Sequence, residues 1–289
     1  MSIRNILFTL LGVYLLSANS MAAQELIERS SPIKPLKTKS RVFLGPVAGL
    51  NRSLHTGGFS SRFSEASCPN FTDGTNNGYY FGLTGEYLLG DVKNSRSSII
   101  ARVIYDYQPA YFQEPGRDDY PSRLTDGSTV ITKIIHTTTV TYTLAQFEIM
   151  YKLNIPGTFF GVTAGPQIGI PISSSQDQRY ELVFDPNNPG IRFSVEDLAT
   201  IIPKELRTEG FEPRFADETY TSIQLYNGKV IHQTAFRAAA KLGLQYEFLL
   251  NRAVFVPSVY YNIGITKMNT DDPWRVNALQ IGADLRYSF

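Results

Sequence analysis

Apolar and polar residues alternate along eight stretches of the chain, each long enough for a tilted membrane-spanning strand of about nine to eleven residues. In the last stretch, Leu279, Ile281 and Leu285 alternate with Gln280 and Asp284. Successive side chains of a strand point to opposite faces, so the pattern predicts one apolar and one polar face for each strand. The stretches are 42–52, 77–89, 97–108, 140–153, 159–171, 235–249, 253–266 and 276–289.

The connections between these stretches alternate in length. Three are long (53–76, 109–139 and 172–234), three are short (90–96, 154–158 and 250–252), and 267–275 is intermediate. A transmembrane barrel has short periplasmic turns at one end and long extracellular loops at the other, whereas a soluble sandwich has no reason to separate its connections in this way.

The sequence therefore predicts an all-β fold, a transmembrane antiparallel up-and-down β-barrel of eight strands over residues 41–289. The segment 172–234 is its longest extracellular loop. The alternative is a ten-stranded barrel, in which 219–226 and 229–235 enter the membrane as well.

Charged residues recur on the polar face of the predicted strands, with equal numbers of acids and bases. Side chains fill the interior of an eight-stranded barrel, so we expect a balanced network of ion pairs and hydrogen bonds that plugs the lumen. The alternative is an ion or proton path, although a conducting pore favours more strands or an excess of one charge. The predicted lumen residues are Glu86, Arg102, Asp106, Glu148, Lys152, Arg237, Lys241, Glu247, Asp284 and Arg286.

The N-terminus has the pattern of a cleaved secretory signal peptide over residues 1–22. It has a basic residue, Arg4, an apolar run at 6–16, and small residues before the expected cleavage site. An N-terminal membrane anchor is the alternative, but the run is shorter than the roughly 20 residues that span a bilayer. We therefore expect an exported chain, with residues 23–40 as a periplasmic lead. Cys68 is the only cysteine, which excludes an intrachain disulfide.

Composition narrows the protein class. The chain is 12% aromatic and rich in strand formers, which excludes an all-helical protein, and its net charge of +1 gives no electrostatic reason to expect nucleic acid as a partner. Aromatic residues near the predicted strand ends fit interfacial girdles, or else ordinary strand packing. They are Tyr79, Tyr80, Phe81, Tyr105, Tyr107, Phe159, Phe160, Tyr260 and Tyr261.

Three prolines, Pro46, Pro166 and Pro257, fall inside predicted strands. Proline cannot donate a hydrogen bond to a strand ladder, and a closed barrel has no free edge. We therefore expect a bulge or a kink at each of them.

The long connections contain ordered patterns of their own. Asn227-Gly228 between the alternating segments 220–226 and 229–235 predicts a hairpin. Ser194, followed by Asp197 at the third helical position, predicts a short capped helix that ends near Pro203. The segment 129–143 is rich in Thr, Val and Ile and predicts an extension of the fourth strand beyond the bilayer.

The sequence contains no recognisable pattern of catalytic, cofactor-binding or metal-binding residues. His55, His136 and His232 have no metal-ligand spacing, and nucleotide-binding and hydrolase motifs are missing from the sequence. One alternative is a lipid-hydrolysing site at the rim, with His136 or His232 as base and a loop serine as nucleophile. The pairs Asp118-Asp119 and Asp271-Asp272 fit solvated loop carboxylates better than a calcium site.

Several segments resemble the PorT-like family of outer-membrane β-barrels. They are GPVAGLNRS at 45–53, GYYFGLTGEYLL at 78–89, FFGVTAGPQIGIP at 159–171 and the alternating C-terminus, NALQIGADLRYSF. The C-terminal Leu285, Tyr287 and Phe289 resemble the signal by which the barrel assembly machinery recognises its substrates. The resemblance implies a location in the bacterial outer membrane and transfers no catalytic residues.

We therefore expect a monomeric, non-enzymatic outer-membrane protein without cofactors, with a structural or surface-binding role through its extracellular loops. Its expected partners are membrane lipids, the assembly machinery during biogenesis, and a surface ligand or envelope protein. The alternatives are a membrane-embedded lipid-modifying enzyme and a component of an envelope secretion assembly, the latter implied by the resemblance.

Overall fold

The computed structural model describes residues 40–58, 70–90, 95–116, 119–124, 126–188, 190–200, 212–250 and 252–288. The predicted signal peptide at 1–22, the lead apart from its last residue, and Cys68, Asp118 and Phe289 lie outside the described residues. Within the described ranges, no helix is long and apolar enough to cross a membrane.

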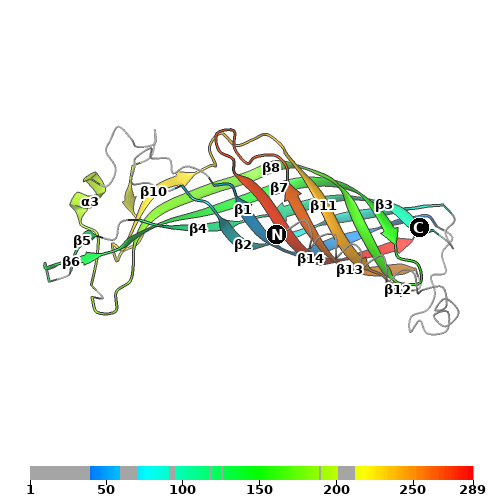
Figure 1. The fold of residues 1–289 in the computed structure, drawn as a ribbon, viewed down its shortest axis with the longest axis horizontal. Coiled ribbons are helices and arrows are strands. Elements are labelled where there is room, and N and C mark those ends of the chain that lie inside the picture. Colours follow the sequence, from blue (N-terminus) through cyan, green and yellow to red (C-terminus); the bar gives the residue numbers. More distant parts are fainter. Residues whose placement is uncertain are drawn as a thin grey trace, which may run out of the picture.

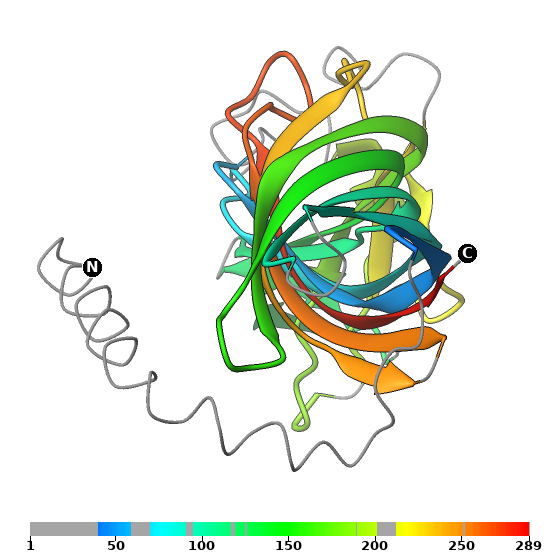
Figure 2. The same cartoon turned by 90° about the vertical axis from the view of Figure 1, so that its right-hand side faces the viewer.

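Eight antiparallel strands form a closed ring, which confirms the predicted barrel (Figures 1 and 2). Each strand pairs with the next one in the list below, and the pairing of β14 with β1, from Phe43↔Ser288 to Thr56↔Arg275, closes the ring. The strands are β1 (Val42–Thr56), β2 (Gly74–Leu89), β3 (Ser97–Tyr107), β7 (Ile134–Asn154), β8 (Phe160–Leu182), β11 (Arg237–Tyr246), β13 (Ala253–Gly264) and β14 (Arg275–Ser288).

The alternation of the sequence separates the inner and outer faces of the barrel as predicted. In β2, Leu83 points outward and is 67% exposed, whereas Thr84 and Glu86 are buried in the interior. We call the end with the connections 90–96, 155–159 and 251–252 the turn end, and the opposite end the loop end. The short strand β12 (Phe248–Leu250) pairs with β13 at the turn end.

Aromatic side chains gather on the outer face near both ends. Tyr79 contacts Tyr107 and Phe81 contacts Tyr105 toward the loop end, with ring centroids 5.3 and 5.0 Å apart. Phe160 and Tyr246, 4.8 Å apart, lie at the turn end. The predicted girdle is wrong for two residues, because Tyr80 and Tyr260 are on the inward parity and are buried.

No bulge forms at the three prolines, so this part of the prediction of a bulge or a kink is wrong. Between β1 and β14 the register is the same on both sides of Pro46, and the register is likewise unchanged around Pro166 and Pro257. All three rings lie on the outward parity, where they leave the inner packing intact. The register shift recorded between β7 and β8 lies at Thr143/Leu144 instead.

The sheet continues beyond the loop end as an extension of the barrel. The upper parts of β7 and β8 pair up to Ile134↔Leu182, and β10 pairs with Gln176–Glu181 of β8. In the barrel, β8 pairs directly with β11, so no strand from the segment between them is inserted into the ring. The barrel therefore has eight strands and not the ten of the alternative. The added elements are β4 (Ala110–Pro115), β5 (Tyr120–Arg123), β6 (Thr129–Thr132), α3 (Val195–Thr200), β9 (Arg214–Phe215) and β10 (Ser222–Gly228).

Two of the three predictions for the loops need correction. The hairpin at Asn227-Gly228 is wrong, because 222–228 pairs with β8 and β9 while 229–235 forms turns and an isolated bridge from Gln233 to Asn269. The extension of the fourth strand begins at Ile134, and Thr129–Thr132 instead pairs with β5. The capped start of the helix is confirmed: the backbone N–H of Asp197 donates to Ser194 Oγ at 3.3 Å, and Ser194 N–H donates back to Asp197 Oδ2. Its predicted end near Pro203 lies outside the described residues.

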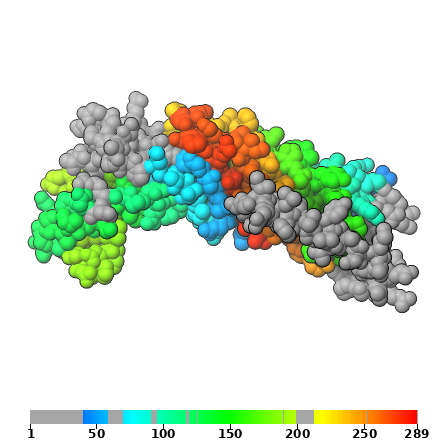
Figure 3. All heavy atoms as spheres, viewed as in Figure 1, coloured from blue at the N-terminus to red at the C-terminus, as the bar shows by residue number. Residues whose placement is uncertain are grey.

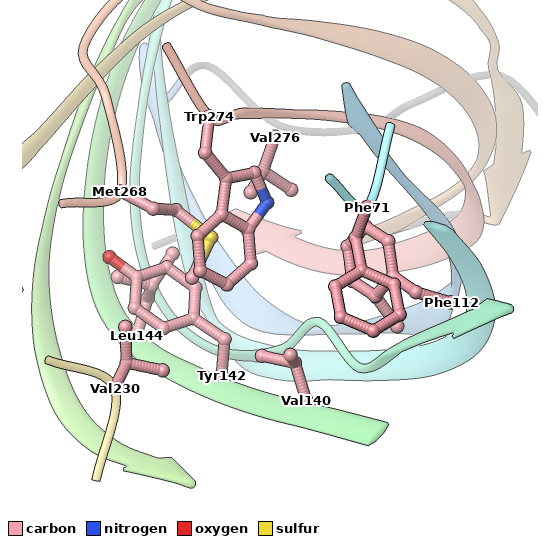
Figure 4. Packing of buried hydrophobic residues seen from close by; sticks show 10 residues of the cluster. Phe71, Phe112, Val140, Tyr142, Leu144, Val230, Met268, Trp274 and Val276 are labelled. Carbon is pink, nitrogen blue, oxygen red and sulfur yellow. The ribbon is translucent and has the colours of Figure 1, made fainter. Parts of the chain in front are cut away.

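Two clusters of buried apolar side chains stabilise the loop end of the barrel and the extension. One, which we call the cap cluster, lies at the loop end and joins barrel strands to the connections above them (Figure 4). It comprises Phe71, Ala110, Phe112, Val140, Tyr142, Leu144, Val230, Met268, Trp274 and Val276. The other holds the tip of the extension together and includes Tyr180, Phe193 and Ile223. The extension therefore has a core of its own, next to the barrel along the long axis in Figure 3.

Candidate functional site

The barrel interior holds all ten of the predicted lumen charges, and eight of them form ion pairs. Toward the turn end, Glu86 binds both Lys152 and Arg286, and Lys152 also binds Glu247. Ser98 donates a hydrogen bond to the same Glu86 carboxylate. This end of the lumen is therefore closed by side chains from five places in the ring: β2, β3, β7, β14 and the residue that follows β11.

Two carboxylates organise the middle of the lumen. Asp284 Oδ2 accepts hydrogen bonds from Arg102 Nη2 at 2.7 Å and from Arg286 Nε at 3.0 Å. Glu148 accepts from Lys241 Nζ at 2.6 Å and lies 3.9 Å from Arg102. All five side chains are buried, so each charge depends on its neighbours rather than on water for stabilisation.

The remaining two charges, Asp106 and Arg237, form no ion pair with a described residue and are joined through Gln108. The Gln108 amide donates to Asp106 Oδ2 at 2.7 Å, and its oxygen accepts from Arg237 Nη1. Arg237 also donates to the carbonyl of Val276. Three further amides donate to Asp106: Asn51, Gln146 and Gln280, at 2.6, 2.9 and 3.0 Å.

Neutral polar residues are the part of this network that the sequence analysis missed. Besides the four amides around Asp106, the Tyr260 hydroxyl accepts from Arg102 Nη2 at 2.6 Å and from the amide of Gln245. The sequence did contain a sign that Tyr260 belongs to the lumen: it alternates in step with the polar residues Ser258 and Asn262, which point inward on β13.

Above the charges, the cap cluster covers the lumen with apolar side chains. Phe112 and Trp274, labelled in Figure 4, have ring centroids 6.0 Å apart, and Phe112 also packs against Phe71. Trp274 Nε1 donates to Nδ1 of the buried His55 at 3.2 Å, which requires His55 to be unprotonated at that atom. An ionic lower layer and an apolar upper layer therefore fill the barrel.

The three histidines do not meet. His55 lies in the cap, His136 is buried in the extension 4.3 Å from the ring of Tyr180, and His232 lies at the surface. His232 Nδ1 is 2.6 Å from Asp271 Oδ2, and this contact lowers the pKa of Asp271. Of the hydrogen bonds within the described ranges, none joins the His232 ring to a serine. The described residues also hold no group of three His, Cys, Asp or Glu side chains arranged to bind a metal.

Acidification is expected to loosen the extension through His136. Burial lowers the pKa of this histidine to about 4 from 6.5, so between these values the unfolded chain binds more protons and stability falls with falling pH. Glu114, opposite on β4, and Tyr180 on β8 are the groups that face it. Amide protection factors of β7 and β8 above the cap, which are corrected for the intrinsic pH dependence of exchange, should therefore be lower at pH 5 than at pH 7.

His136→Gln should remove most of this pH dependence, because glutamine carries no titrating group. His232→Gln is the matched control, since that side chain is 67% exposed. Equal pH dependence in the wild type and in His136→Gln would contradict the prediction.

No family model and no curated protein matches the chain, so the resemblance to PorT-like proteins stays a prediction. Among solved structures, the chain is similar to Ail, the attachment invasion locus protein of Yersinia pestis (11% identity, 86% of this chain and 100% of that chain covered, TM-score 0.30). It is also similar to the outer membrane protease OmpT from Escherichia coli (9%, 90% and 100%, TM-score 0.36) and to the outer membrane protein OprG from Pseudomonas aeruginosa (12%, 87% and 97%, TM-score 0.32). At such TM-scores the assignment of the barrel depends on the closed ring of strand pairing alone.

Proposed function

We propose that the chain is an integral protein of the bacterial outer membrane, with a plugged lumen, both termini in the periplasm and a binding surface on its extension outside the cell. The observation that carries the proposal is the apolar belt around the barrel. Leu50, Leu83 and Val103 on three neighbouring strands are 61–68% exposed, although water would disfavour such a continuous apolar surface.

The dimensions of the belt support a bilayer as its surroundings. Along β2 the outward side chains are apolar from Tyr79 to Tyr87, which matches the length of about nine residues that a tilted strand needs to span. Aromatic rings mark both limits, where amphipathic rings are stabilised at the headgroup level. A hollow of about 300 Å³ in this belt, between Leu44, Gly85 and Phe147, is apolar and fits lipid chains.

The filled lumen supports a non-enzymatic role at the surface rather than transport. The ion pairs and the cap cluster occupy the space through which a solute would pass. The extension, by contrast, presents an independently packed surface at the end away from the short turns, and structured surface loops often bind ligands. The resemblance to PorT-like barrels agrees with this location.

A tryptophan on the belt should report the membrane directly. With Trp274, the only tryptophan, replaced by Phe, we expect Leu83→Trp to be quenched strongly by lipids with brominated acyl chains, because Leu83 lies in the middle of the belt. Ile131→Trp on β6 is the matched control: Ile131 is 62% exposed but belongs to the extension, so little quenching is expected. Equal quenching at both positions, or none at Leu83→Trp, would refute the membrane placement.

A further inference from the structure

A pocket of about 340 Å³ lies at the tip of the extension. It adjoins the start of α3, which Figure 1 labels at this end of the molecule. It forms between the end of β5 and the segment that leads into α3. Its walls include Arg123, Arg192, Phe193, Ser194, Glu196 and Tyr220. The volume lies at the lower end of the range for small-molecule sites, about 300–1,000 Å³.

The backbone places two arginines side by side in this pocket. Arg123 and Arg192 are opposite partners in an antiparallel β-bridge, in which the N–H of Arg192 donates to the carbonyl of Arg123 at 3.1 Å. The Ser122 hydroxyl reinforces the bridge through a hydrogen bond to the carbonyl of Arg192 at 2.9 Å. The spacing of the two side chains is therefore fixed by the sheet and by this hydroxyl.

Like charges directly opposite each other destabilise a strand pair. Elsewhere in the extension, Arg179 is paired with Asp177 and Arg214 donates to Gln224 at 2.9 Å. Within the described ranges, the side chains of Arg123 and Arg192 form neither an ion pair nor a hydrogen bond. An anion from outside would offset this repulsion, and paired guanidinium groups match the oxygens of a phosphate or carboxylate.

An aromatic ring forms another wall of the pocket. Tyr220 has a φ of 60°, which is unusual for a bulky residue, and its carbonyl accepts a hydrogen bond from the N–H of Phe193 at 2.8 Å. Its ring packs edge-on against Phe215, with centroids 4.5 Å apart, and remains 42% exposed. The ring is thus held beside the arginines with a surface free for stacking.

We propose that this arginine-pair pocket binds a sugar-sized molecule that carries one phosphate or carboxylate group. The arginines bind the anionic group and Tyr220 stacks on the ring of the ligand. Glu196 disfavours ligands that are negatively charged throughout, because it places an acidic side chain on the same wall. The inference rests on the proposed function, because in the proposed membrane orientation this tip faces the medium outside the cell.

Calorimetric titration of the full chain, folded in detergent micelles, tests the proposal. Glucose 6-phosphate and glucuronate are the probes, with glucose and inorganic phosphate as comparisons. We expect at least one acidic sugar to bind at least about tenfold more tightly than both comparisons. Binding of glucose as tight as that of the acidic sugars would overturn the role of the arginines, and equally tight binding of inorganic phosphate would overturn the assignment to a sugar.

The variants Arg123→Gln and Arg192→Gln should each weaken binding by about tenfold or more. Arg275→Gln is the matched control, because Arg275 is an exposed arginine at the start of β14, outside the pocket. A loss of affinity in Arg275→Gln equal to that in the pocket variants would overturn the proposal. Heating the same samples in SDS separates the two claims: failure to show a heat-dependent mobility shift refutes the barrel in the membrane, whereas failure to bind with an intact shift refutes only the pocket.

Discussion

Replacing Asp284 by Asn is expected to lower the free energy of unfolding by about 3–5 kcal/mol. One carboxylate oxygen of Asp284 accepts hydrogen bonds from both Arg102 and Arg286, and all three side chains are buried. Asparagine keeps the size of the side chain but removes the charge that balances two guanidinium groups. Arg286 would keep Glu86 and Arg102 would keep Glu148, but the buried network would carry one uncompensated positive charge, which is the costly situation for buried ions.

The measurement is urea unfolding of the barrel folded in lipid vesicles, followed by the fluorescence of Trp274, the single tryptophan. Asp126→Asn is the matched control, because Asp126 lies fully exposed between β5 and β6, and its substitution should leave the unfolding midpoint unchanged. A loss below about 1 kcal/mol for Asp284→Asn would mean that the lumen charges are stabilised mainly by water.

Phe112→Ala is expected to cost about 3–5 kcal/mol, the range for truncating a fully buried phenylalanine. The ring of Phe112 packs among Phe71, Trp274 and His55, with centroids 5.8–6.1 Å away. Truncation leaves a cavity in the middle of the cap cluster, next to the indole of Trp274. The emission of Trp274 should therefore shift to longer wavelength, since water gains access to it.

Tyr111→Ala provides the comparison for this variant. Tyr111 is the neighbour of Phe112 on β4, but it points to the opposite face and is 41% exposed. Its truncation should cost less than half as much and leave the emission of Trp274 in place. Similar losses in both variants would show that β4, rather than the packing of the cap, determines the stability of this region.

The barrel was predictable because two environments act on each strand. Neighbours such as Leu83 and Thr84 face opposite sides of the wall, so the sequence alternates, and the loop lengths show how the strands connect. The same parity placed the charged lumen residues inside. Parity also predicts the inner face for Tyr80, which alternates in step with Thr84 and Glu86. Its position near a strand end suggested an aromatic girdle on the outer face instead.

The extension was less predictable because its pairing is not local. Asn227-Gly228 has the composition of a hairpin turn, yet β8 offers 222–228 a long edge that is distant in sequence. The amide partners of Asp106 were also not predictable from the local sequence. An amide such as Gln108 suits any polar position, so nothing in its local pattern distinguishes a lumen ligand from a solvated residue. The arginine pair of the tip likewise depends on a bridge between distant segments.

The ladder between β7 and β8 has a mechanical consequence. It runs from Asn154↔Gly161 near the short turn to Ile134↔Leu182 at the tip, interrupted by one register shift. A pull applied to the tip along the barrel axis moves β7 and β8 together, and therefore loads the ladders that join β7 to β3 and β8 to β11 in shear, many hydrogen bonds at once rather than one after another. The barrel wall and the tip share these two strands, so a load on the tip passes directly to the barrel, the part of the chain that we propose spans the bilayer.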